Sequence, residues 1–396
     1  MSSPSDSIVR APRHILPVIV VGQFLCTSLW FAVNAVMPEL QAQRSLPDDA
    51  VGLLTSSVQF GFILGTLIFA LLSMADRYMP TRLFGICALL GSASTALAAG
   101  LAPAIEGLMA LRLVTGFCLA GIYPVGMKIA AGWYRQGLGT ALGWLVGALL
   151  FGTALPHAVR AFGATAPWQT VLLTVSALSA LGGLMVWRWI PEAPAAAAAS
   201  VGRLTDLRAI WARPALRASV LGYFGHMWEL YTMFVLIPAV VLLRVDAGPN
   251  ASWLAFLAIG SGGVGCIAGG LLAPRFGSAR VAGGMLATSA LCCLAAPWAL
   301  SSPWPLFLAW LMVWGFAAAG DSPQFSALTA RNAPVHAVGS VLTFVNCIGF
   351  AISIISIQLF VSATRHAELG AILPWLAAGP ILGLVAMAPL WRLSTH

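Results

Sequence analysis

Long apolar runs follow one another along the chain, separated by short polar or proline- and glycine-rich stretches. A helix needs about 20 mostly apolar residues to cross a bilayer. Twelve runs of about that length occur, at 15–38, 50–74, 82–102, 106–128, 138–159, 168–190, 217–242, 251–273, 281–301, 305–328, 338–361 and 370–391. They are continuous and lack the alternation of a transmembrane β-barrel. The pattern predicts an all-α integral membrane protein with twelve transmembrane helices.

The composition supports this class and excludes others. Only 8% of the 396 residues are charged and 60% are hydrophobic, whereas a soluble domain carries about 25% charged residues. The net charge of +8 does not indicate nucleic acid, because the basic residues are scattered singly between apolar runs. The seven cysteines also lie in apolar runs and form no C-x-x-C pair. We therefore expect no disulfide, no metal site and no cofactor.

The loops predict the orientation. With the N-terminus inside, fifteen Lys and Arg residues fall on the inner side and four on the outer side. Cytoplasmic loops are the ones enriched in these residues, so both termini are predicted to be cytoplasmic. The first run follows Arg10 and Arg13 as a signal peptide would, but it is too long and lacks a small-x-small cleavage site. We expect it to be a retained span.

Two halves of the chain echo each other at an offset of 198–200 residues. The matching pairs are Gly22-Gln23-Phe24 with Gly222-Tyr223-Phe224, Ala75-Asp76-Arg77-Tyr78 with Ala273-Pro274-Arg275-Phe276, and Ala120-Gly121-Ile122-Tyr123-Pro124 with Ala319-Gly320-Asp321-Ser322-Pro323. The order of the three pairs indicates a duplication. The predicted organisation is a tail at 1–14, a six-helix bundle at 15–190, a linker at 191–216, a second six-helix bundle at 217–391 and a tail at 392–396. Such 6+6 repeats are typical of secondary transporters with a site between the halves.

These features resemble the major facilitator superfamily. Ala75-Asp76-Arg77 followed by Arg82 is similar to the family's loop signature G-x-L-A-D-R-x-G-R-K, and residues 270–277 are similar to a second copy. The resemblance implies a secondary active transporter that works by alternating access and uses this loop for gating. The gating residues would be Asp76, Arg77, Arg82 and Arg275. Leu111-Arg112 with Gly116 resembles the family's R-x-x-x-G pattern. Pro156-His157 stands where the family's antiporters have Gly-Pro, which disfavours a drug–proton antiporter.

Few ionisable residues lie inside the runs, and each is a functional candidate because charge in hydrocarbon is costly. Helical spacing places polar and aromatic residues on one stripe of runs one, four, seven and ten. The resemblance implies that these four helices line the central cavity. The expected solute-binding residues are Arg112, Gln23, Trp30, Asn34, Tyr123, Tyr223, Met233, Trp314 and Gln324. We expect Arg112 and Glu229 to face each other across the cavity.

Proton coupling is assigned to Glu229, His226 and Asp321, because burial disfavours the charged form of a carboxyl group and histidine titrates near neutral pH. Each of these three residues, and Arg112 as well, also has a structural alternative to its proposed role. Glu229 would form an ion pair that locks two helices, Arg112 would bind helix carbonyls, His226 would pack in a hydrogen-bonded core, and Asp321 would cap a broken helix.

The favoured function is proton-coupled symport of a small organic anion across a bacterial inner membrane by a monomer, with protons, the solute and the lipid bilayer as its partners. One alternative is a copper importer that uses Cys26, His226, Met227 and Met233, and another is a proton-coupled efflux antiporter. A receptor or an intramembrane enzyme is disfavoured, because the runs show no nucleophile–base pair or metal triad.

Overall fold

The computed structural model describes residues 11–101, 104–134, 138–193 and 208–393, and every regular element in these ranges is helical. Ten helical segments are long and apolar enough to cross a membrane. Two shorter apolar helices, Ile15–Thr27 and Ser278–Leu294, fall in the first and ninth predicted runs. The all-helical membrane architecture is confirmed. The predicted tails and linker lie partly outside the described residues.

The first part of the chain forms one set of helices. Its elements are α1 (Ile15–Thr27), η1 (Asn34–Val36), α2 (Met37–Arg44), α3 (Ala50–Leu71), α4 (Met74–Arg77), α5 (Pro80–Leu101), α6 (Ile105–Ala120), α7 (Tyr123–Trp133), α8 (Leu138–Phe162) and α9 (Trp168–Trp189). We call α1 to α9 the N-terminal set.

The second part forms another set. Its elements are α10 (Arg208–Ala212), α11 (Pro214–Leu242), α12 (Pro249–Phe276), α13 (Ser278–Leu294), α14 (Ala296–Ser301), α15 (Trp304–Gly320), α16 (Ser322–Asn332), η3 (Val335–Ala337), α17 (Val338–Ala363), α18 (Leu369–Ile372), η4 (Leu373–Ala377) and α19 (Ala378–Leu393). We call α11 to α19 the C-terminal set.

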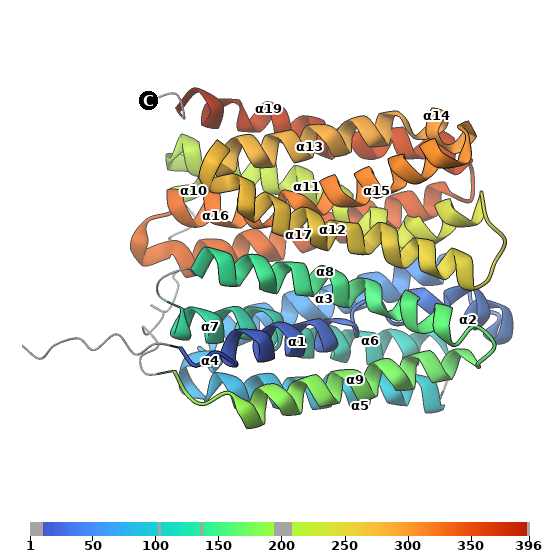
Figure 1. Cartoon of the computed structure of the whole chain (residues 1–396), viewed down its shortest axis with the longest axis horizontal. Helices are drawn as coiled ribbons and strands as arrows, with labels where there is room; N and C mark the ends of the chain where they lie inside the picture. Colours follow the sequence, from blue (N-terminus) through green and yellow to red (C-terminus); the bar gives the residue numbers. More distant parts are fainter. Residues whose placement is uncertain (1–10, 102–103, 135–137, 194–207, 394–396) are drawn as a thin grey trace, which may run out of the picture.

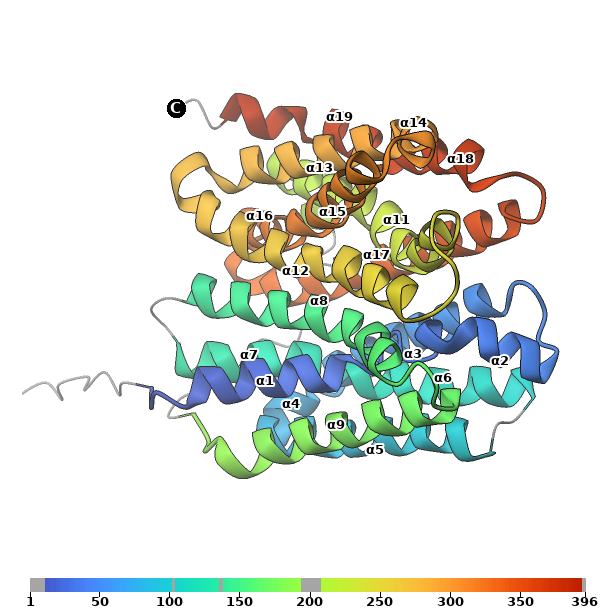
Figure 2. The ribbon, with the colours of Figure 1, turned by 45° about the vertical axis from the view of Figure 1, so that its right-hand side comes forward.

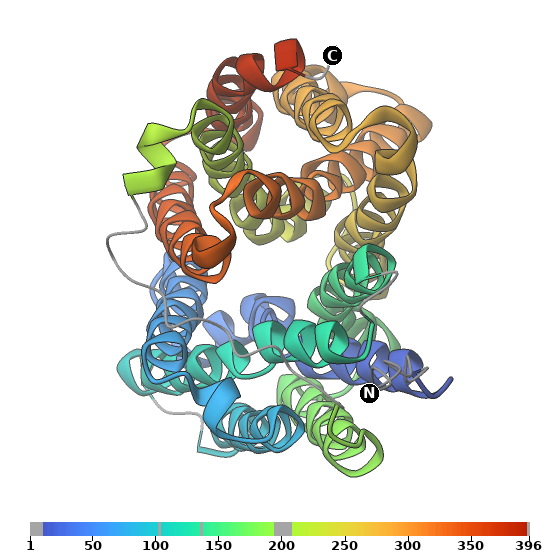
Figure 3. The ribbon, with the colours of Figure 1, turned by 90° about the vertical axis from the view of Figure 1, so that its left-hand side faces the viewer.

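The two sets lie one above the other (Figures 1 and 2), and the start of α1 and the end of α19 lie at the same end of the molecule. A view from that end shows where the sets meet (Figure 3). Helix α3 packs along α17 at one edge, and α8 packs along α12 at the other. The α8–α12 contact is close: a Cβ built on Gly263 would lie 2.8 Å from the ring of Phe151. We call the end where α1 starts and α19 ends the terminal end, and the opposite end the distal end.

Several runs that were predicted to be continuous are interrupted, among them 15–38, 106–128, 281–301, 305–328 and 370–391. Helix α1 ends at Thr27 and is followed by turns with i to i−3 hydrogen bonds, such as that from the Trp30 amide to the Thr27 carbonyl at 3.0 Å. Helix α13 ends at Leu294, and α14 begins with Pro297 in its first turn. Proline has no N–H and cannot continue the preceding helix. The predicted helices 15–38 and 281–301 are therefore wrong as unbroken elements.

A matching break occurs in both sets at the repeated sequence. Helix α6 ends at Ala120 and α7 begins at Tyr123, while α15 ends at Gly320 and α16 begins at Ser322. Each new helix has a proline in its first turn, Pro124 in one case and Pro323 in the other. The sequence echo therefore corresponds to a shared local structure.

Candidate functional site

A small cavity lies between the two sets of helices. Its volume is about 30 Å³, enough for about two water molecules. Helices α7 and α8 supply one wall, and α11, α16 and α17 supply the other. The lining residues are Tyr123, Leu149, Leu150, Thr153, Tyr223, Met227, Leu230, Tyr231, Phe234, Ser322, Ser326, Asn346 and Phe350. The molecule is thus nearly closed around a space shared by both sets, which we call the central cavity.

The polar groups of the central cavity are hydroxyls and one amide. The Tyr223 hydroxyl donates a hydrogen bond of 2.9 Å to the side-chain oxygen of Asn346. Tyr123 and Thr153 approach from the N-terminal set, and Ser322 and Ser326 from α16. All the lining residues in the described part of the chain are uncharged. Such a wall recognises a solute by hydrogen bonds and apolar contact rather than by an opposite charge.

Aromatic rings from both sets close the distal side of the central cavity. The Trp30 ring stacks at 5.8 Å from Tyr231 and 5.6 Å from Phe350, and Phe31 meets Phe234 edge to face at 5.9 Å. Trp30 and Phe31 belong to the N-terminal set, and their three partners belong to α11 and α17. We call these five rings, Trp30, Phe31, Tyr231, Phe234 and Phe350, the aromatic seal. The predicted solute-binding residue Trp30 thus lies in the aromatic seal, beside the cavity.

Polar contacts between α3 and α17, and between residues just outside these two helices, extend this closure towards the distal end. An oxygen of Asp49 lies 2.8 Å from a guanidinium nitrogen of Arg365. The Gln358 side chain donates to the Ser56 hydroxyl at 2.7 Å, and the Ser353 hydroxyl donates to the Gln59 side-chain oxygen at 2.9 Å. We call these three pairs the distal ladder.

Glu229 lies inside the C-terminal set. Its carboxyl group accepts hydrogen bonds from the Trp314 indole N–H at 2.8 Å, the Ser289 hydroxyl at 2.8 Å and the Cys293 thiol at 3.1 Å. The donors come from α13 and α15, and the Glu229 side chain is buried. Trp314 was predicted to bind solute, but here it orients this carboxyl group.

A second buried carboxyl group lies at the break between α15 and α16. An oxygen of Asp321 lies 2.7 Å from Nδ1 of His226, and both side chains are fully buried. The two atoms are at ion-pair distance, but the ring is not aligned for a hydrogen bond. The break that Asp321 was expected to cap is present, yet its side chain makes no capping hydrogen bond. Ser322, the next residue, lines the central cavity.

Arg112 is held by the backbone of the N-terminal set. Its guanidinium group donates to the carbonyl oxygen of Leu29 at 2.9 Å and to that of Trp30. These carbonyls belong to the turns after α1, where helical partners are missing. Arg112 and Glu229 are thus each enclosed in a different set, and the expectation that they face each other across the cavity is wrong.

Comparison with known proteins agrees with this architecture. The family model described as Major Facilitator Superfamily matches residues 19–358. The chain belongs to the Major Facilitator Superfamily. Members of this family are transporters, so the expectation of a transport protein rather than an enzyme is confirmed.

Three known transporters are each at most 30% identical to this Major Facilitator protein over the aligned residues. A 3-(3-hydroxy-phenyl)propionate transporter of Escherichia coli (strain K12) is 30% identical over 202 residues, which cover 50% of this chain and 48% of that one. The aligned part of the chain thus spans about half the length of this relative. The proton:xylose symporter XylE has the same fold, with a TM-score of 0.75, 13% identity and coverage of 96% of this chain and 94% of that one. The nucleoside transporter NupG gives a TM-score of 0.73 at 15% identity, covering 95% and 100%.

The structure separates the predicted solute-binding residues of this Major Facilitator protein. Tyr123 and Tyr223 line the central cavity. The others lie elsewhere in the described structure: Arg112 and Gln23 inside the N-terminal set, Trp30 in the aromatic seal, Asn34 at a distal pocket, and Met233, Trp314 and Gln324 buried in the C-terminal set. The residues that sequence reasoning did not assign to the site, such as Thr153, Ser326 and Asn346, are small hydroxyl or amide side chains. Such residues are common in apolar helices, so their presence in the sequence does not mark a binding site.

The predicted gating residues lie at the terminal end. Asp76 accepts a hydrogen bond of 2.5 Å from Lys128 Nζ, which also donates to the Ala75 carbonyl at 2.7 Å. Arg77, Arg82 and Arg275 are exposed. Across the described ranges, His, Cys, Asp and Glu form no group of three that could hold a metal ion. Of the ligands considered for copper, Cys26 donates to the Ser179 carbonyl at 3.3 Å and His226 pairs with Asp321.

Proposed function

We propose that the chain carries a small aromatic organic acid together with a proton across a bacterial inner membrane, by opening the central cavity alternately at its two ends. The observation that carries this proposal is the composition of the cavity wall. Tyr223, Asn346, Ser322 and Ser326 offer hydrogen-bonding groups, and Tyr231 and Phe350 offer ring faces. The hydroxyphenylpropionate transported by the E. coli relative has an aromatic ring, a hydroxyl group and a carboxyl group.

The absence of charge among the described lining residues favours cotransport with a proton. A carboxylate entering a weakly polar, closed cavity carries a desolvation cost that a neutral group avoids. A proton that crosses in the same cycle lowers this cost, because the loaded protein then gains no net charge. A buried carboxyl group is suited to carry that proton.

Glu229 is the proposed proton carrier. Its three partners, Trp314, Ser289 and Cys293, each have a hydrogen to donate, so they stabilise an ionised carboxylate, while burial opposes its charge. These opposed effects allow both protonation states to be used in a cycle. Asp321 pairs with His226 and directly precedes the cavity residue Ser322. This pair is proposed to link the interior of the C-terminal set, where Glu229 lies, to the cavity wall.

The proposed transport cycle also requires that the central cavity be closed at one end while it is open at the other. The aromatic seal and the distal ladder join the two sets on one side of the cavity. We propose that the two sets move as the predicted halves 15–190 and 217–391. The distal contacts would break when the distal end opens to the outside.

The test is uptake of radiolabelled 3-(3-hydroxyphenyl)propionate into proteoliposomes with an imposed pH gradient, acid outside. Wild-type protein should accumulate the acid above its external concentration, and dissipating the gradient should abolish accumulation. Glu229→Gln should lose accumulation but keep counterflow exchange, because exchange needs no net proton movement. Full accumulation by Glu229→Gln would eliminate its proposed role.

The solute site is tested by the pair Tyr223→Phe and Asn346→Ala. Both variants remove one hydrogen bond in the cavity wall, so each should weaken the apparent affinity by about tenfold. Arg188→Lys, at an exposed position on α9, is the control and should leave the affinity within a factor of two. If the wild type neither transports nor exchanges this acid, the proposed solute is wrong.

A further inference from the structure

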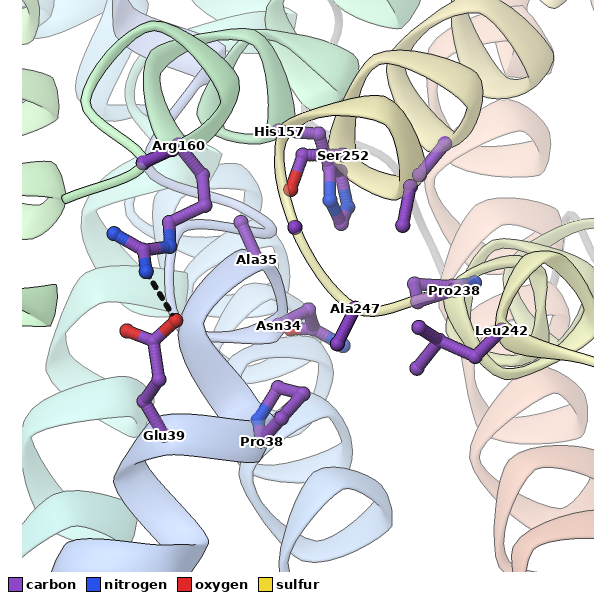
Figure 4. Close-up of a pocket in the computed structure, with 14 residues that line it drawn as sticks. Asn34, Ala35, Pro38, Glu39, His157, Arg160, Pro238, Leu242, Ala247 and Ser252 are labelled. Atoms are coloured by element: carbon purple, nitrogen blue, oxygen red, sulfur yellow. Dashed lines mark hydrogen bonds and ion pairs between the residues drawn. The ribbon is translucent and has the colours of Figure 1, made fainter. Parts of the chain in front are cut away.

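A second pocket lies between the two sets at the distal end (Figure 4). Its volume is about 100 Å³. The N-terminal set contributes η1, α2 and α8, and the C-terminal set contributes α11, α12 and the loop between them. Most of the wall is apolar and includes Pro38, Pro238 and Leu242. We call this the distal pocket.

One polar group in the distal pocket lacks a partner. His157 of α8 is buried, with 2% of its surface exposed, and its Nε2 has no hydrogen-bond partner among the described residues. The close-up shows its ring beside Ser252 at the pocket wall (Figure 4). Leaving a buried polar atom unpaired costs free energy. Such an atom beside a cavity indicates that something else completes its hydrogen bonding.

The charged groups at the pocket are already neutralised. Arg160 donates to a carboxyl oxygen of Glu39 and to the carbonyl oxygens of Gly163 and Ala166. Because the two charges offset each other, neither an anion nor a cation would meet an uncompensated opposite charge in the pocket. The Glu39 side chain is 35% exposed, so the rim of the pocket reaches the surface. These observations favour an uncharged ligand that enters from the distal end.

Size and hydrogen bonding narrow the ligand further. A closed cavity of about 150 Å³ in another protein holds one benzene molecule, so in this pocket of about 100 Å³ a single small ring fits by extending partly through the open rim. A hydroxyl group can donate and accept, so it can pair with His157 Nε2 in either tautomer. We propose that the distal pocket binds a small neutral phenol or ring alcohol, with its hydroxyl group on His157 and its ring against the apolar wall.

This position has a consequence for the transport cycle. The pocket exists only while both sets meet at the distal end, since each supplies part of its wall. A ligand that binds one conformation better than another shifts the population towards it. Occupancy of the distal pocket therefore holds the distal end closed.

The binding test uses phenol as the probe and a cysteine placed at the pocket, Ser252→Cys. The seven native cysteines are buried, so a small hydrophilic thiol reagent should label the new one selectively. Phenol should slow labelling at Ser252→Cys but not at Asp48→Cys, a matched site on an exposed distal loop. Equal effects at both sites, or none at Ser252→Cys, would overturn the proposal.

Substitutions at His157 identify the contact. His157→Phe keeps a ring but removes both nitrogens, so the phenol concentration needed for protection should rise about tenfold. His157→Gln retains a hydrogen-bonding group, so phenol should protect the cysteine at position 252 nearly as well in this variant as in the wild-type background. Thr153→Val, one turn earlier on α8 in the central cavity, should leave protection unchanged. Ala251→Leu fills the pocket and should abolish protection, and unaltered protection in both His157→Phe and Ala251→Leu would refute the site.

The conformational effect is measured separately. Spin labels are placed at positions 48 and 368, on distal loops of different sets. The distance between them, measured by pulsed electron paramagnetic resonance, reports the opening of the distal end. Phenol should increase the short-distance population in the wild type and have no effect in Ala251→Leu. Binding without any shift in distance would overturn the locking effect. None of these measurements uses the transported solute, and the Ala251→Leu and Thr153→Val variants separate phenol binding at the distal pocket from phenol binding in the central cavity.

Discussion

Ser353 on α17 donates a hydrogen bond to the side chain of Gln59 on α3, and both residues are fully buried where the two sets of helices meet. The neighbouring Asp49–Arg365 pair joins the same two sets at the surface, with 32% and 39% of those side chains exposed. The buried neutral contact and the exposed ion pair should therefore differ in strength.

Loss of the buried contact should open the distal end more than loss of the ion pair. Ser353→Ala leaves the Gln59 oxygen unpaired, at a cost of about 1–3 kcal/mol, so the open population should rise by about tenfold or more. Asp49→Asn removes an exposed pair worth about 0.2–1 kcal/mol, which corresponds to at most about a fivefold change. Distances between spin labels at Asp48 and Glu368 give both populations. The reverse ranking would show that charge dominates this contact.

Arg112 should act on stability rather than on solute affinity. Its two hydrogen bonds end on the carbonyls of Leu29 and Trp30, and hydrogen bonds to charged groups contribute about 1.5–3 kcal/mol each. Arg112→Lys keeps the charge but cannot span both carbonyls with a planar group, so it should lower the melting temperature of the purified protein. Arg82→Lys, at an exposed position, is the control. A normal melting temperature with a large loss of solute affinity would contradict this assignment.

The His226–Asp321 pair should show strong coupling between its members. When His226 is protonated the two groups form a buried ion pair, and removing one partner of such a pair costs about 3–5 kcal/mol, because the other charge stays buried and unpaired. His226→Phe and Asp321→Asn should each destabilise the protein by that order, and the double variant should be less destabilised than the sum. A double-mutant cycle from denaturation measurements gives the coupling energy. Additive effects would show that the two groups do not interact in the folded protein.

Close helix packing makes a further prediction about two glycines. A Cβ on Gly116 of α6 would lie 1.8 Å from the Val58 carbonyl oxygen of α3, so Gly116→Ala forces these helices apart. Around Gly143 of α8 the described atoms leave open space within 4 Å of a built Cβ. Gly116→Ala should greatly reduce the yield of folded protein in a fluorescence-detected size-exclusion assay, and Gly143→Ala should not. Equal yields would contradict the close α3–α6 packing.

Much of the fold was predictable from apolar run length, because the bilayer sets the length of a spanning helix. The sequence echo around Pro124 and Pro323 coincides with the paired breaks, since proline cannot continue the preceding helix. The echo alone indicated only a duplication, and the runs 106–128 and 305–328 were predicted to be unbroken. The turns after Thr27 were not predictable. They depend on Arg112, whose partners are backbone carbonyls, and a carbonyl has no signature in the sequence.

The site was predictable only in part. Helical spacing places residues on one face of a helix, but it does not say which neighbour that face meets. Tyr123 and Tyr223 line the central cavity, whereas Glu229 points to Ser289 and Cys293 of α13. That helix shows no polar stripe in the sequence. Ser289 and the adjacent cysteines Cys292 and Cys293 become informative only when the packing of the helix is known.

The paired breaks give each set a bend beside the cavity. Tyr123 and Ser322, the first residues after the two bends, both line it. A helix segment that follows a break can change its tilt without disturbing the hydrogen bonds of the segment before it. We therefore expect α7 and α16 to lean outward at the terminal end while the two sets move as halves. Access from that side would then combine the displacement of these two short segments with the rotation of the halves.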